Sequence, residues 1–312
     1  MLKLFSGTSN PNLSKKVAES ANLTLGKMEV VRFENSEVRV RIGEDVRNDV
    51  CVIIQSTANP TDTNLMELFL ICDALRRQEA KKVIGVIPYF GYARQDIQHR
   101  PGECISASVI VKFIESIGFH KVYTFDLHDE ATEGVFTIPF KNLSALPLLA
   151  KEVTTYLQKQ GITVDQKSVA IVSPDQGGIE RARKFGEAMF GTREFDLALI
   201  EKRRDLAHIH ESTALALYGD VKGKVAIVVD DVATSGRTLI HAAEHCVQQG
   251  AKSAIAVVVH RDFAKDTAKK IQESSIEAFF TTDTIAMKEY YSFEKMKEIS
   301  VGQTIAETLT SY

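Results

Sequence analysis

The sequence predicts an α/β protein made of two domains, each a mostly parallel sheet flanked by helices. Short apolar runs alternate along the chain with stretches of helical periodicity, a pattern typical of parallel sheets covered on both faces. The chain has 312 residues, and at about 150 residues per domain this length suits two domains. A weak internal repeat points to the same division.

The expected strands are continuous apolar runs, which indicate strands buried on both faces. They cover residues 28–33, 50–55, 83–88, 121–126, 168–173, 197–200, 225–231, 253–260 and 276–282. Helical periodicity is clearest over residues 64–77, where Leu65, Leu68 and Leu75 share one face. Asn10 followed by Pro11 predicts the start of a helix, with an N-cap and then proline at the first position.

A hairpin is expected over residues 28–42. Val38, Val40 and Ile42 alternate with arginines, which is the period of two that a half-buried strand shows. Its tip falls at residues 34–37. A hairpin that projects from an α/β domain is a candidate binding element.

The internal repeat relates residues 50–91 to residues 225–262. Both segments run through a strand, a polar turn, a helix and a second strand. This duplication predicts one domain over residues 1–145 and a second over residues 146–312. Asp230 and Asp231 stand only in the second copy, where the first has Gln55 and Ser56. We therefore expect both domains to share one fold, and the sugar or metal chemistry of the acid pair to be confined to the second domain.

Composition excludes several classes of protein. Hydrophobic residues make up 44% of the chain and the net charge is −3, so we expect neither disorder nor attraction to nucleic acid. No apolar run approaches the roughly 18 residues that a membrane span needs, and the N-terminus lacks the hydrophobic region of a signal peptide. The four cysteines are widely spaced. We therefore expect a reduced, cytoplasmic protein without membrane contacts.

The segment from residue 228 to residue 238 carries the clearest chemistry. An apolar run ends in two acids, where open α/β sheets bind ligands, and a turn rich in hydroxyls leads into a helix N-terminus suited to a phosphate. The acids can accept hydrogen bonds from ribose hydroxyls. The segment resembles the ribose-phosphate motif of type I phosphoribosyltransferases, which implies a sugar-phosphate site at Asp230, Asp231, Thr234, Ser235, Gly236, Arg237 and Thr238.

Further motifs follow in one order over nearly the whole chain. They are Phe5-Ser6-Gly7, Arg32-Phe33-x-x-x-Glu37, Asn64-Leu65-Met66-Glu67-Leu68, the block from Ile87 to Asp96, Asp126-Leu127-His128, Ser173-Pro174-Asp175-Gln176-Gly177-Gly178, Glu201-Lys202-Arg203-Arg204 and the segment from Gly219 to Lys224. Together they resemble the ribose-phosphate diphosphokinases (PRPP synthetases). The resemblance implies two tandem phosphoribosyltransferase-like domains and a Mg²⁺-dependent transfer of the diphosphoryl group of ATP to the 1-hydroxyl of ribose 5-phosphate. It also implies a homo-oligomer, either a dimer or a hexamer.

The resemblance assigns roles to individual residues. Lys202 and Arg204 match the catalytic basic pair, which would stabilise charge on the migrating group, and Arg204 would also contact ribose 5-phosphate. His128 and Asp175 match the magnesium-linked positions. The residues matched to ATP binding are Arg94, Gln95, Asp96, His128 and, at the hairpin tip, Phe33, Asn35, Ser36 and Glu37.

Departures from the family pattern leave alternatives open. Asn35 and Ser36 stand where the family usually has aspartate and glycine, and Thr234 and Arg237 stand where it has aspartate and a small residue. A phosphoribosyltransferase that consumes PRPP, or a divergent synthetase with an altered donor or a regulatory role, would also fit these features.

A zinc hydrolase is a weaker alternative. His241-x-x-Glu244-His245 matches an inverted zinc-peptidase signature, and histidines four residues apart lie on one side of a helix. One face of that helix is expected to pack on the sheet, and spacing reveals no third ligand.

Overall fold

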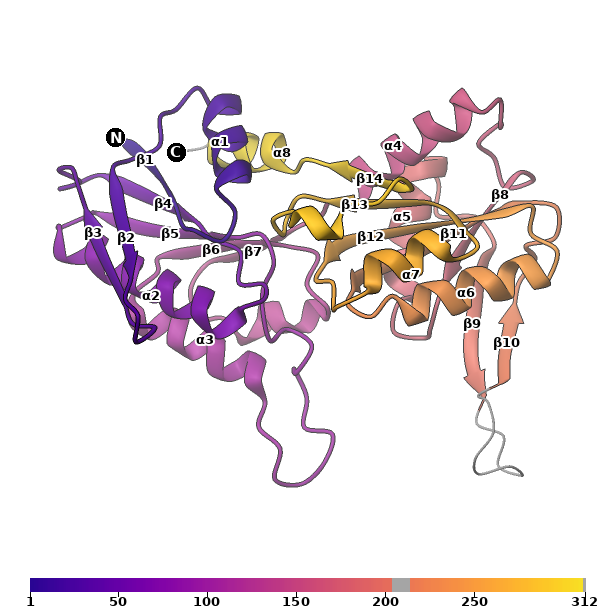
Figure 1. Cartoon of the computed structure of the whole chain (residues 1–312), viewed down its shortest axis with the longest axis horizontal. Coiled ribbons are helices and arrows are strands. Elements are labelled where there is room, and N and C mark those ends of the chain that lie inside the picture. The colour runs from indigo at the N-terminus through magenta and orange to yellow at the C-terminus, as the bar shows by residue number, and fades with distance from the viewer. Residues whose placement is uncertain (204–213, 311–312) are drawn as a thin grey trace. The chain divides into compact units, whose positions relative to one another are not determined.

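The computed structural model describes residues 1–203 and 214–310, which divide into two compact units (Figure 1). The first unit contains Met1–Ser144 and also residues 283–286 and 300–310, whereas the second contains Ala145–Thr282 and Met287–Ile299. The predicted fold class is confirmed, because each unit is a mostly parallel sheet flanked by helices. The sequence-based division assigned all of residues 146–312 to the second domain. In the structure, two short segments of that range pack with the first unit.

The sheet of the first unit is entirely parallel and has the order β1-β4-β5-β6-β7. Its strands are β1 (Leu2–Ser6), β4 (Val50–Ile54), β5 (Lys82–Ile87), β6 (Lys121–Phe125) and β7 (Phe140–Leu143). Helices α2 (Thr61–Arg77) and α3 (Ser106–Ile117) cover one face, and α1 (Pro11–Ser20) and α8 (Gly302–Leu309) cover the other (Figure 1). A short 3₁₀ segment, η1 (Glu130–Val135), precedes β7.

Helix α1 begins as the sequence predicts, and its N-cap residue Asn10 also bonds to Asp283, which lies far along the chain. The Asn10 side chain accepts a hydrogen bond from the backbone N–H of Leu13 at 3.2 Å and donates one to the carbonyl of Asp283 at 2.7 Å. The buried Asp283 carboxylate pairs with Lys16 Nζ at 2.8 Å and accepts from the backbone N–H of Val301 at 2.9 Å. These bonds attach α8 to the first unit.

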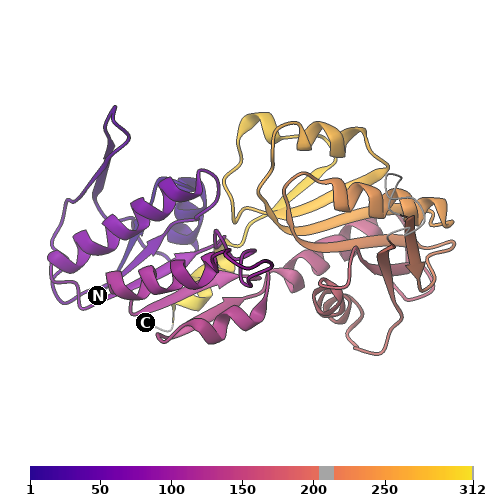
Figure 2. The same ribbon diagram turned by 90° about the horizontal axis from the view of Figure 1, so that it is seen from below.

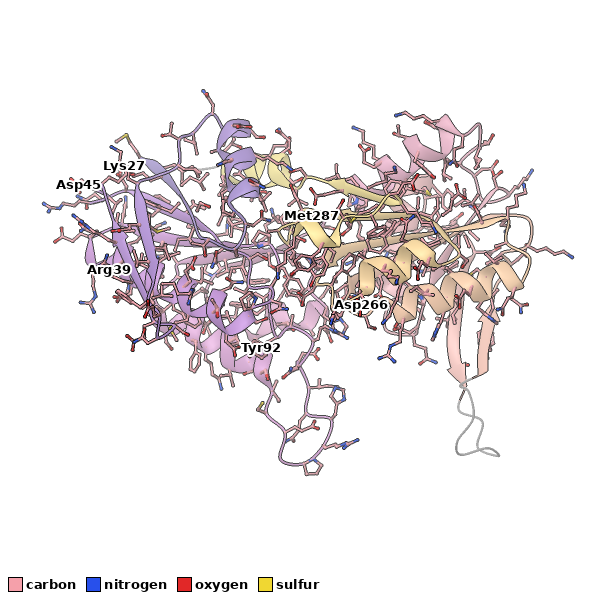
Figure 3. The ribbon with its side chains drawn as sticks, in the orientation of Figure 1. Lys27, Arg39, Asp45, Tyr92, Asp266 and Met287 are labelled. Carbon is pink, nitrogen blue, oxygen red and sulfur yellow. The ribbon has the colours of Figure 1, made fainter. Side chains whose placement is uncertain are left out.

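The expected hairpin is confirmed. Strands β2 (Met28–Arg32) and β3 (Val38–Ile42) are antiparallel, and Arg32 lies opposite Val38 beside the tip. Figure 2 shows the hairpin projecting from the rest of the first unit. Figure 3 labels Arg39 on this hairpin.

The sheet of the second unit has the order β10-β9-β8-β11-β12-β13-β14. Its strands are β8 (Val169–Ser173), β9 (Leu197–Arg203), β10 (Ala214–Tyr218), β11 (Val225–Ala233), β12 (Ser253–Arg261), β13 (Ile276–Thr282) and β14 (Met296–Ile299). Only β10 is antiparallel to its neighbour among the described strands of this sheet. Helices α4 (Leu146–Lys159) and α5 (Ile179–Phe190) cover one face, and α6 (Arg237–Gln248) and α7 (Thr267–Glu273) cover the other (Figure 1). A 3₁₀ turn, η2 (Glu289–Tyr291), precedes β14.

Every strand expected from an apolar run is present. Strands β1, β7, β10 and β14, which the apolar runs did not predict, all lie at the edge of a sheet. An edge strand has one neighbour and a partly exposed surface, so polar residues interrupt its pattern, as in the sequence of β14, Met-Lys-Glu-Ile. No helix in the described part of the chain is long and apolar enough to cross a membrane.

Candidate functional site

The acidic residues of the candidate site lie toward the carboxyl ends of β8 and β11, which are central strands of the second unit. β8 lies beside β11 in parallel, with Val172 opposite Val228, and β9 lies parallel on its other side. Asp175 therefore follows β8 at the same edge of the sheet at which Asp230 and Asp231 end the apolar part of β11. This is the edge at which open α/β sheets bind ligands.

Arg181 pairs with both members of the acid pair. Its Nη1 atom lies 3.2 Å from Asp230 Oδ1 and 3.5 Å from Asp231 Oδ1, and all three side chains are largely shielded from solvent. Asp230 Oδ1 also accepts the backbone N–H of Asp231 at 2.9 Å. Burial and the neighbouring Asp231 carboxylate raise the pKa of Asp230 to about 8, and the Arg181 charge opposes this rise. The site therefore holds two carboxylates and one compensating cation.

Sequence reasoning missed Arg181. It stands in the first turn of α5, six positions after Asp175, on a helix that packs against β8 and β11. The sequence did contain a signal for it, because an arginine stands near the N-terminus of the helix that follows the acidic turn. Only the order of the strands shows that this arginine meets the end of β11.

The turn after β8 orders Asp175. Asp175 Oδ1 accepts the backbone N–H of Gly178 at 3.0 Å, and Ser173 Oγ donates to the Asp175 carbonyl at 2.7 Å. The carboxylate itself is exposed. Gln176 Nε2 donates to Glu201 Oε1 on β9 at 2.8 Å, so the turn is tied to the strand that carries Lys202.

Of the two residues matched to the catalytic basic pair, Lys202 is described only in its backbone and Arg204 is not described. The backbone of Lys202 lies in β9, opposite Leu215 of β10. The Lys202 side chain and all of Arg204 lie outside the described residues. Their assigned roles stay predictions.

Residues 234–238 form the turn into α6. Gly236 has a φ of 71°, a left-handed conformation, and a Cβ at this position would lie 3.2 Å from Thr267 Cγ2, so glycine suits it on both counts. The Thr234 carbonyl accepts hydrogen bonds from the N–H of Ala264 at 2.9 Å and from Thr267 Oγ1 at 2.8 Å. Helix α6 has no side-chain N-cap. Its first N–H groups are thus available to an anion.

The side chains of this turn differ in exposure. Thr234, Ser235 and Thr238 are half-buried, and Arg237, the first residue of α6, is exposed. The predicted sugar-phosphate residues thus form one continuous segment that begins at the acid pair and ends in the first turn of a helix.

In the first unit, the hairpin tip presents an aromatic ring to solvent. Phe33 is 45% exposed, and the Arg39 guanidinium lies 5.8 Å from its ring centroid. Backbone bonds join the Phe33 N–H to the Glu37 carbonyl and the Ser36 N–H to the Phe33 carbonyl, each at 2.9 Å. Asn35 Oδ1 accepts the Glu37 N–H at 3.2 Å. Ser36 has a φ of 72°, which explains why glycine is the ordinary residue for such a position.

The loop after β5 carries Arg94, Gln95 and Asp96. Gln95 accepts a hydrogen bond from Ser106 Oγ at 2.5 Å through Oε1, and its carbonyl accepts the Ala107 N–H at 3.1 Å, so the loop is anchored to the start of α3. Arg94 and Gln95 are exposed, and Asp96 is half-buried. Tyr92, labelled at the start of this loop in Figure 3, bonds to Asp62 on α2.

His128 follows β6, the parallel neighbour of β5. Its side chain is exposed. The preceding residues are held in place, since Asn142 Oδ1 accepts the Leu127 N–H at 3.1 Å and Ser144 Oγ donates to Asp126 at 2.8 Å. His128 and the residues from 94 to 96 therefore leave the same edge of one sheet.

The metal-linked residues belong to different units, His128 to the first and Asp175 to the second. Within residues 1–203 and 214–310, no group of three or more histidine, cysteine, aspartate and glutamate side chains could hold a metal ion. The His241-x-x-Glu244-His245 motif on α6 is therefore not part of such a group. Magnesium needs only one or two protein oxygen ligands when substrate phosphates supply the others. The exposed Asp175 carboxylate fits that requirement.

Comparisons with known proteins agree with the order of the motifs. A family model for the N-terminal domain of ribose phosphate pyrophosphokinase matches residues 2–118, and one for the phosphoribosyl synthetase-associated domain matches residues 165–311. The ribose-phosphate pyrophosphokinase of Fusobacterium nucleatum is 38% identical over 99% of this chain and 94% of its own length. That of Caldanaerobacter subterraneus is 39% identical over 99% and 93%.

A solved structure shows the same architecture. The phosphoribosylpyrophosphate synthetase of Mycobacterium smegmatis superposes with a TM-score of 0.90 and is 28% identical. The match covers 99% of this chain and 98% of that one.

Proposed function

This chain belongs to the ribose-phosphate pyrophosphokinase family, and we propose that it transfers the diphosphoryl group of ATP to the 1-hydroxyl of ribose 5-phosphate. The products are PRPP and AMP. The observation that carries the proposal is that one continuous segment of the second unit holds both the acid pair and a helix N-terminus suited to a phosphate. Paired carboxylates in the last part of β11 are followed, after a short turn, by the uncapped N-terminus of α6.

The ribose end of the site follows from these groups. The N–H groups at the start of α6 and the hydroxyls of Thr234, Ser235 and Thr238 suit the 5-phosphate, because a helix N-terminus attracts an anion. Asp230 and Asp231 accept hydrogen bonds from the ribose hydroxyls. The opposing Arg181 charge favours the ionised, accepting form of the pair.

The nucleotide end is proposed to lie in the first unit. The exposed Phe33 ring offers an adenine base a surface for stacking, with Asn35, Ser36 and Glu37 beside it. Arg94 offers a guanidinium to the phosphates, and Gln95, Asp96 and His128 leave the same edge of the sheet.

Transfer needs no covalent intermediate. The 1-hydroxyl oxygen of ribose 5-phosphate forms a bond to the β-phosphorus of ATP, and the bond from that phosphorus to the α–β bridging oxygen breaks. AMP leaves with the electron pair, and the hydroxyl proton passes to solvent. Lys202 and Arg204 supply positive charge near the migrating group, since stabilisation of charge and in-line positioning dominate phosphoryl transfer.

We propose that His128 and Asp175 help to bind Mg²⁺ together with substrate oxygens. A bound Mg²⁺ would neutralise charge on the ATP phosphates and hold them in line. The exposure of both side chains is compatible with ligands that are shared with a substrate.

A homo-oligomer, a dimer or a hexamer, is the proposed assembly. Ile105, just before α3, and Val109 and Phe113 on α3 follow one another at four-residue intervals, and all are exposed, as is Met66 on α2. Phe113 is 54% exposed and packs edge-on against Phe69 of α2. Exposed apolar side chains clustered in this way mark a contact surface, which a second copy of the chain would cover.

We also propose a cytoplasmic enzyme, because Cys51, Cys72, Cys104 and Cys246 are free thiols.

The test measures AMP released from ATP and ribose 5-phosphate in the presence of Mg²⁺, with the phosphorylated sugar followed in parallel. We expect equal amounts of AMP and PRPP. AMP no higher than an enzyme-free blank would overturn the proposal.

A phosphoribosyltransferase is the second candidate, favoured by Thr234 and by the exposed Arg237 in the turn. It would consume PRPP and release diphosphate in the presence of a nitrogenous base. A panel of bases supplied with PRPP tests this candidate directly, and diphosphate release without AMP formation would favour it.

A further inference from the structure

A completely buried carboxylate lies at the base of the hairpin tip. The Glu67 side chain on α2 has no exposed surface. Its Oε1 atom accepts hydrogen bonds from the backbone N–H of Thr8 at 2.7 Å and from Gln55 Nε2 at 3.1 Å, and its Oε2 atom accepts from Thr8 Oγ1 at 2.7 Å. A buried carboxylate with these partners is held in one position.

The partners of Glu67 come from the ends of two strands. Thr8 follows β1 and Gln55 follows β4, which pair in parallel. Gln55 Oε1 also accepts the N–H of Ser9 at 3.1 Å, and a Cβ at Gly7 would lie 2.1 Å from that same oxygen. The network therefore belongs to the rigid carboxyl edge of the sheet.

Arg32 connects this edge to the hairpin tip. Its Nη2 atom lies 3.6 Å from Glu67 Oε2, and its Nη1 atom donates to the Ser36 carbonyl at 3.1 Å. One planar guanidinium thus reaches the buried anion on one side and the turn of the tip on the other. Arg32 itself is 39% exposed at its side chain, so it is not needed to fill the core.

We propose that Arg32 is a positioning residue for the nucleotide, which orients the hairpin tip by joining the Ser36 carbonyl to the buried Glu67 carboxylate. The proposal rests on the proposed function for the role of the tip in ATP binding. Phe33 and Glu37 flank the turn whose carbonyl Arg32 holds. Without the arginine, the turn keeps its internal hydrogen bonds but loses its link through Arg32 to the buried Glu67 carboxylate on α2.

Two variants separate the effect of the positive charge at residue 32 from the effect of the hydrogen-bonding geometry of a guanidinium. Arg32→Met keeps most of the side-chain length and removes both donors, and Arg32→Lys keeps a charge near Glu67 but cannot bond to both partners in the same way. Arg41→Met is the matched control, since Arg41 is an exposed arginine of the same hairpin, on β3 and away from the tip.

The first measurement is steady-state kinetics of the full-length enzyme. We expect Arg32→Met to raise KM for ATP about tenfold, the equivalent of one hydrogen bond made by a charged group. The kcat and the KM for ribose 5-phosphate should change less than about threefold. Arg32→Lys should recover part of the KM for ATP, and Arg41→Met should match the wild type. Equal KM values for ATP in Arg32→Met and Arg41→Met would overturn the proposal.

The second measurement does not depend on catalysis. The chain has no tryptophan, so Glu34→Trp at the exposed tip places a single fluorescent reporter there. We expect its fluorescence anisotropy to fall when Arg32→Met is added and to stay unchanged with Arg41→Met. If the enzyme makes no PRPP, the anisotropy still tests the attachment of the tip. An anisotropy unaltered by Arg32→Met would refute that attachment, whatever the reaction.

Discussion

At the scale of the residue, the acid pair in the last part of β11 has a structural cost that the proposed binding of a sugar phosphate explains. Asp230 and Asp231 are adjacent, largely buried and of like charge, and Arg181 compensates only part of that charge. Natural proteins keep such costly groups mainly at functional sites. Paired acceptors near the uncapped N-terminus of α6, which suits an anion, fit a sugar phosphate.

The raised pKa of Asp230 predicts a pH-dependent affinity for ribose 5-phosphate. Above pH 7 the sugar phosphate is already largely dianionic, since its second pKa is about 6. Ionisation of Asp230, whose pKa is about 8, then strengthens its acceptance of ribose hydroxyls, so KM for ribose 5-phosphate should fall between about pH 7 and pH 9. Asp230→Asn should abolish this trend, and Arg181→Met should move it to higher pH. A KM independent of pH in the wild type would contradict the assignment.

The same shift affects stability with a defined sign. The folded-state pKa of Asp230 lies above its ordinary value of 3.8. Between these values the folded state binds more protons than the unfolded state, so the free energy of unfolding decreases as pH rises from about 4 to 8. Thermal unfolding of Asp230→Asn should therefore show a weaker decline in Tm over this range than the wild type does.

In the proposed mechanism, Lys202 is the residue on which the transfer step should depend most. We expect Lys202→Ala to lower kcat by about 10²-fold or more, as the loss of one donor that stabilises a transition state typically does, with little change in ribose 5-phosphate binding. Lys159→Ala, at the exposed end of α4, is the control. An unaltered kcat in Lys202→Ala would exclude a catalytic role.

At the scale of the element, the β2–β3 hairpin shows how a departure from the family pattern can be accommodated. Ser36 takes the left-handed conformation that glycine adopts without strain. Asn35 still supplies an oxygen to the Glu37 N–H, as an aspartate could. The tip therefore closes without the residues usual in the family.

Substitutions at Ser36 should separate backbone from side chain. Ser36→Gly relieves a strain of about 1–2 kcal/mol, partly offset by the freedom of glycine in the unfolded chain, so KM for ATP should stay within about twofold. Ser36→Val, a β-branched residue in the left-handed region, should raise it. Ser36→Ala is the control for the hydroxyl. A rise in KM for ATP shared by Ser36→Gly and Ser36→Ala would show that the hydroxyl, not the turn, is what matters.

At the scale of the whole molecule, the chain returns to its first unit twice, at residues 283–286 and again from residue 300 onward. Asp283 binds Lys16 and the Val301 N–H, and α8 packs beside α1. Helix α8, the last helix along the chain, therefore belongs to the first unit. One buried carboxylate, that of Asp283, contributes to its attachment together with the packing of α8 on α1.

Loss of this carboxylate should loosen α8. Asp283→Ala leaves the Val301 N–H and the Lys16 ammonium without their partner, at a cost of about 2 kcal/mol. We expect faster proteolytic cleavage before α8, followed by mass spectrometry, while Glu19→Ala, an exposed acid of α1, should behave as the wild type. Equal cleavage rates in all three proteins would contradict this view of Asp283.

The apolar surface on α2 and α3 makes a prediction about assembly. Phe113→Glu places a charge in that surface and should shift the sedimentation coefficient toward that of a single chain. Lys112→Gln changes the net charge equally at a neighbouring exposed position and should leave the assembly intact. A Phe113→Glu protein that sediments like the wild type would remove this surface from the interface.

Much of the fold and of the candidate site was accessible from the sequence. Apolar runs predicted the central strands, alternation predicted the hairpin, and Asn10 with Pro11 predicted the start of α1. These are local patterns, since a few neighbouring residues decide them. The motifs that named Asp230, Arg94 and His128 are likewise continuous segments, although their roles stay predictions.

The sequence by itself determined the α/β class, the duplicated order of elements and the segments that carry the chemistry. Only the tertiary structure decided that the strands missing from the prediction lie at sheet edges, that Arg181 meets the acid pair, that Glu67 anchors Arg32, and that residues 283–286 and 300–310 join the first unit. The physical reason is distance along the chain. Periodicity records how a segment faces solvent and core, whereas ion pairs between distant residues depend on strand order and packing, which no single segment encodes.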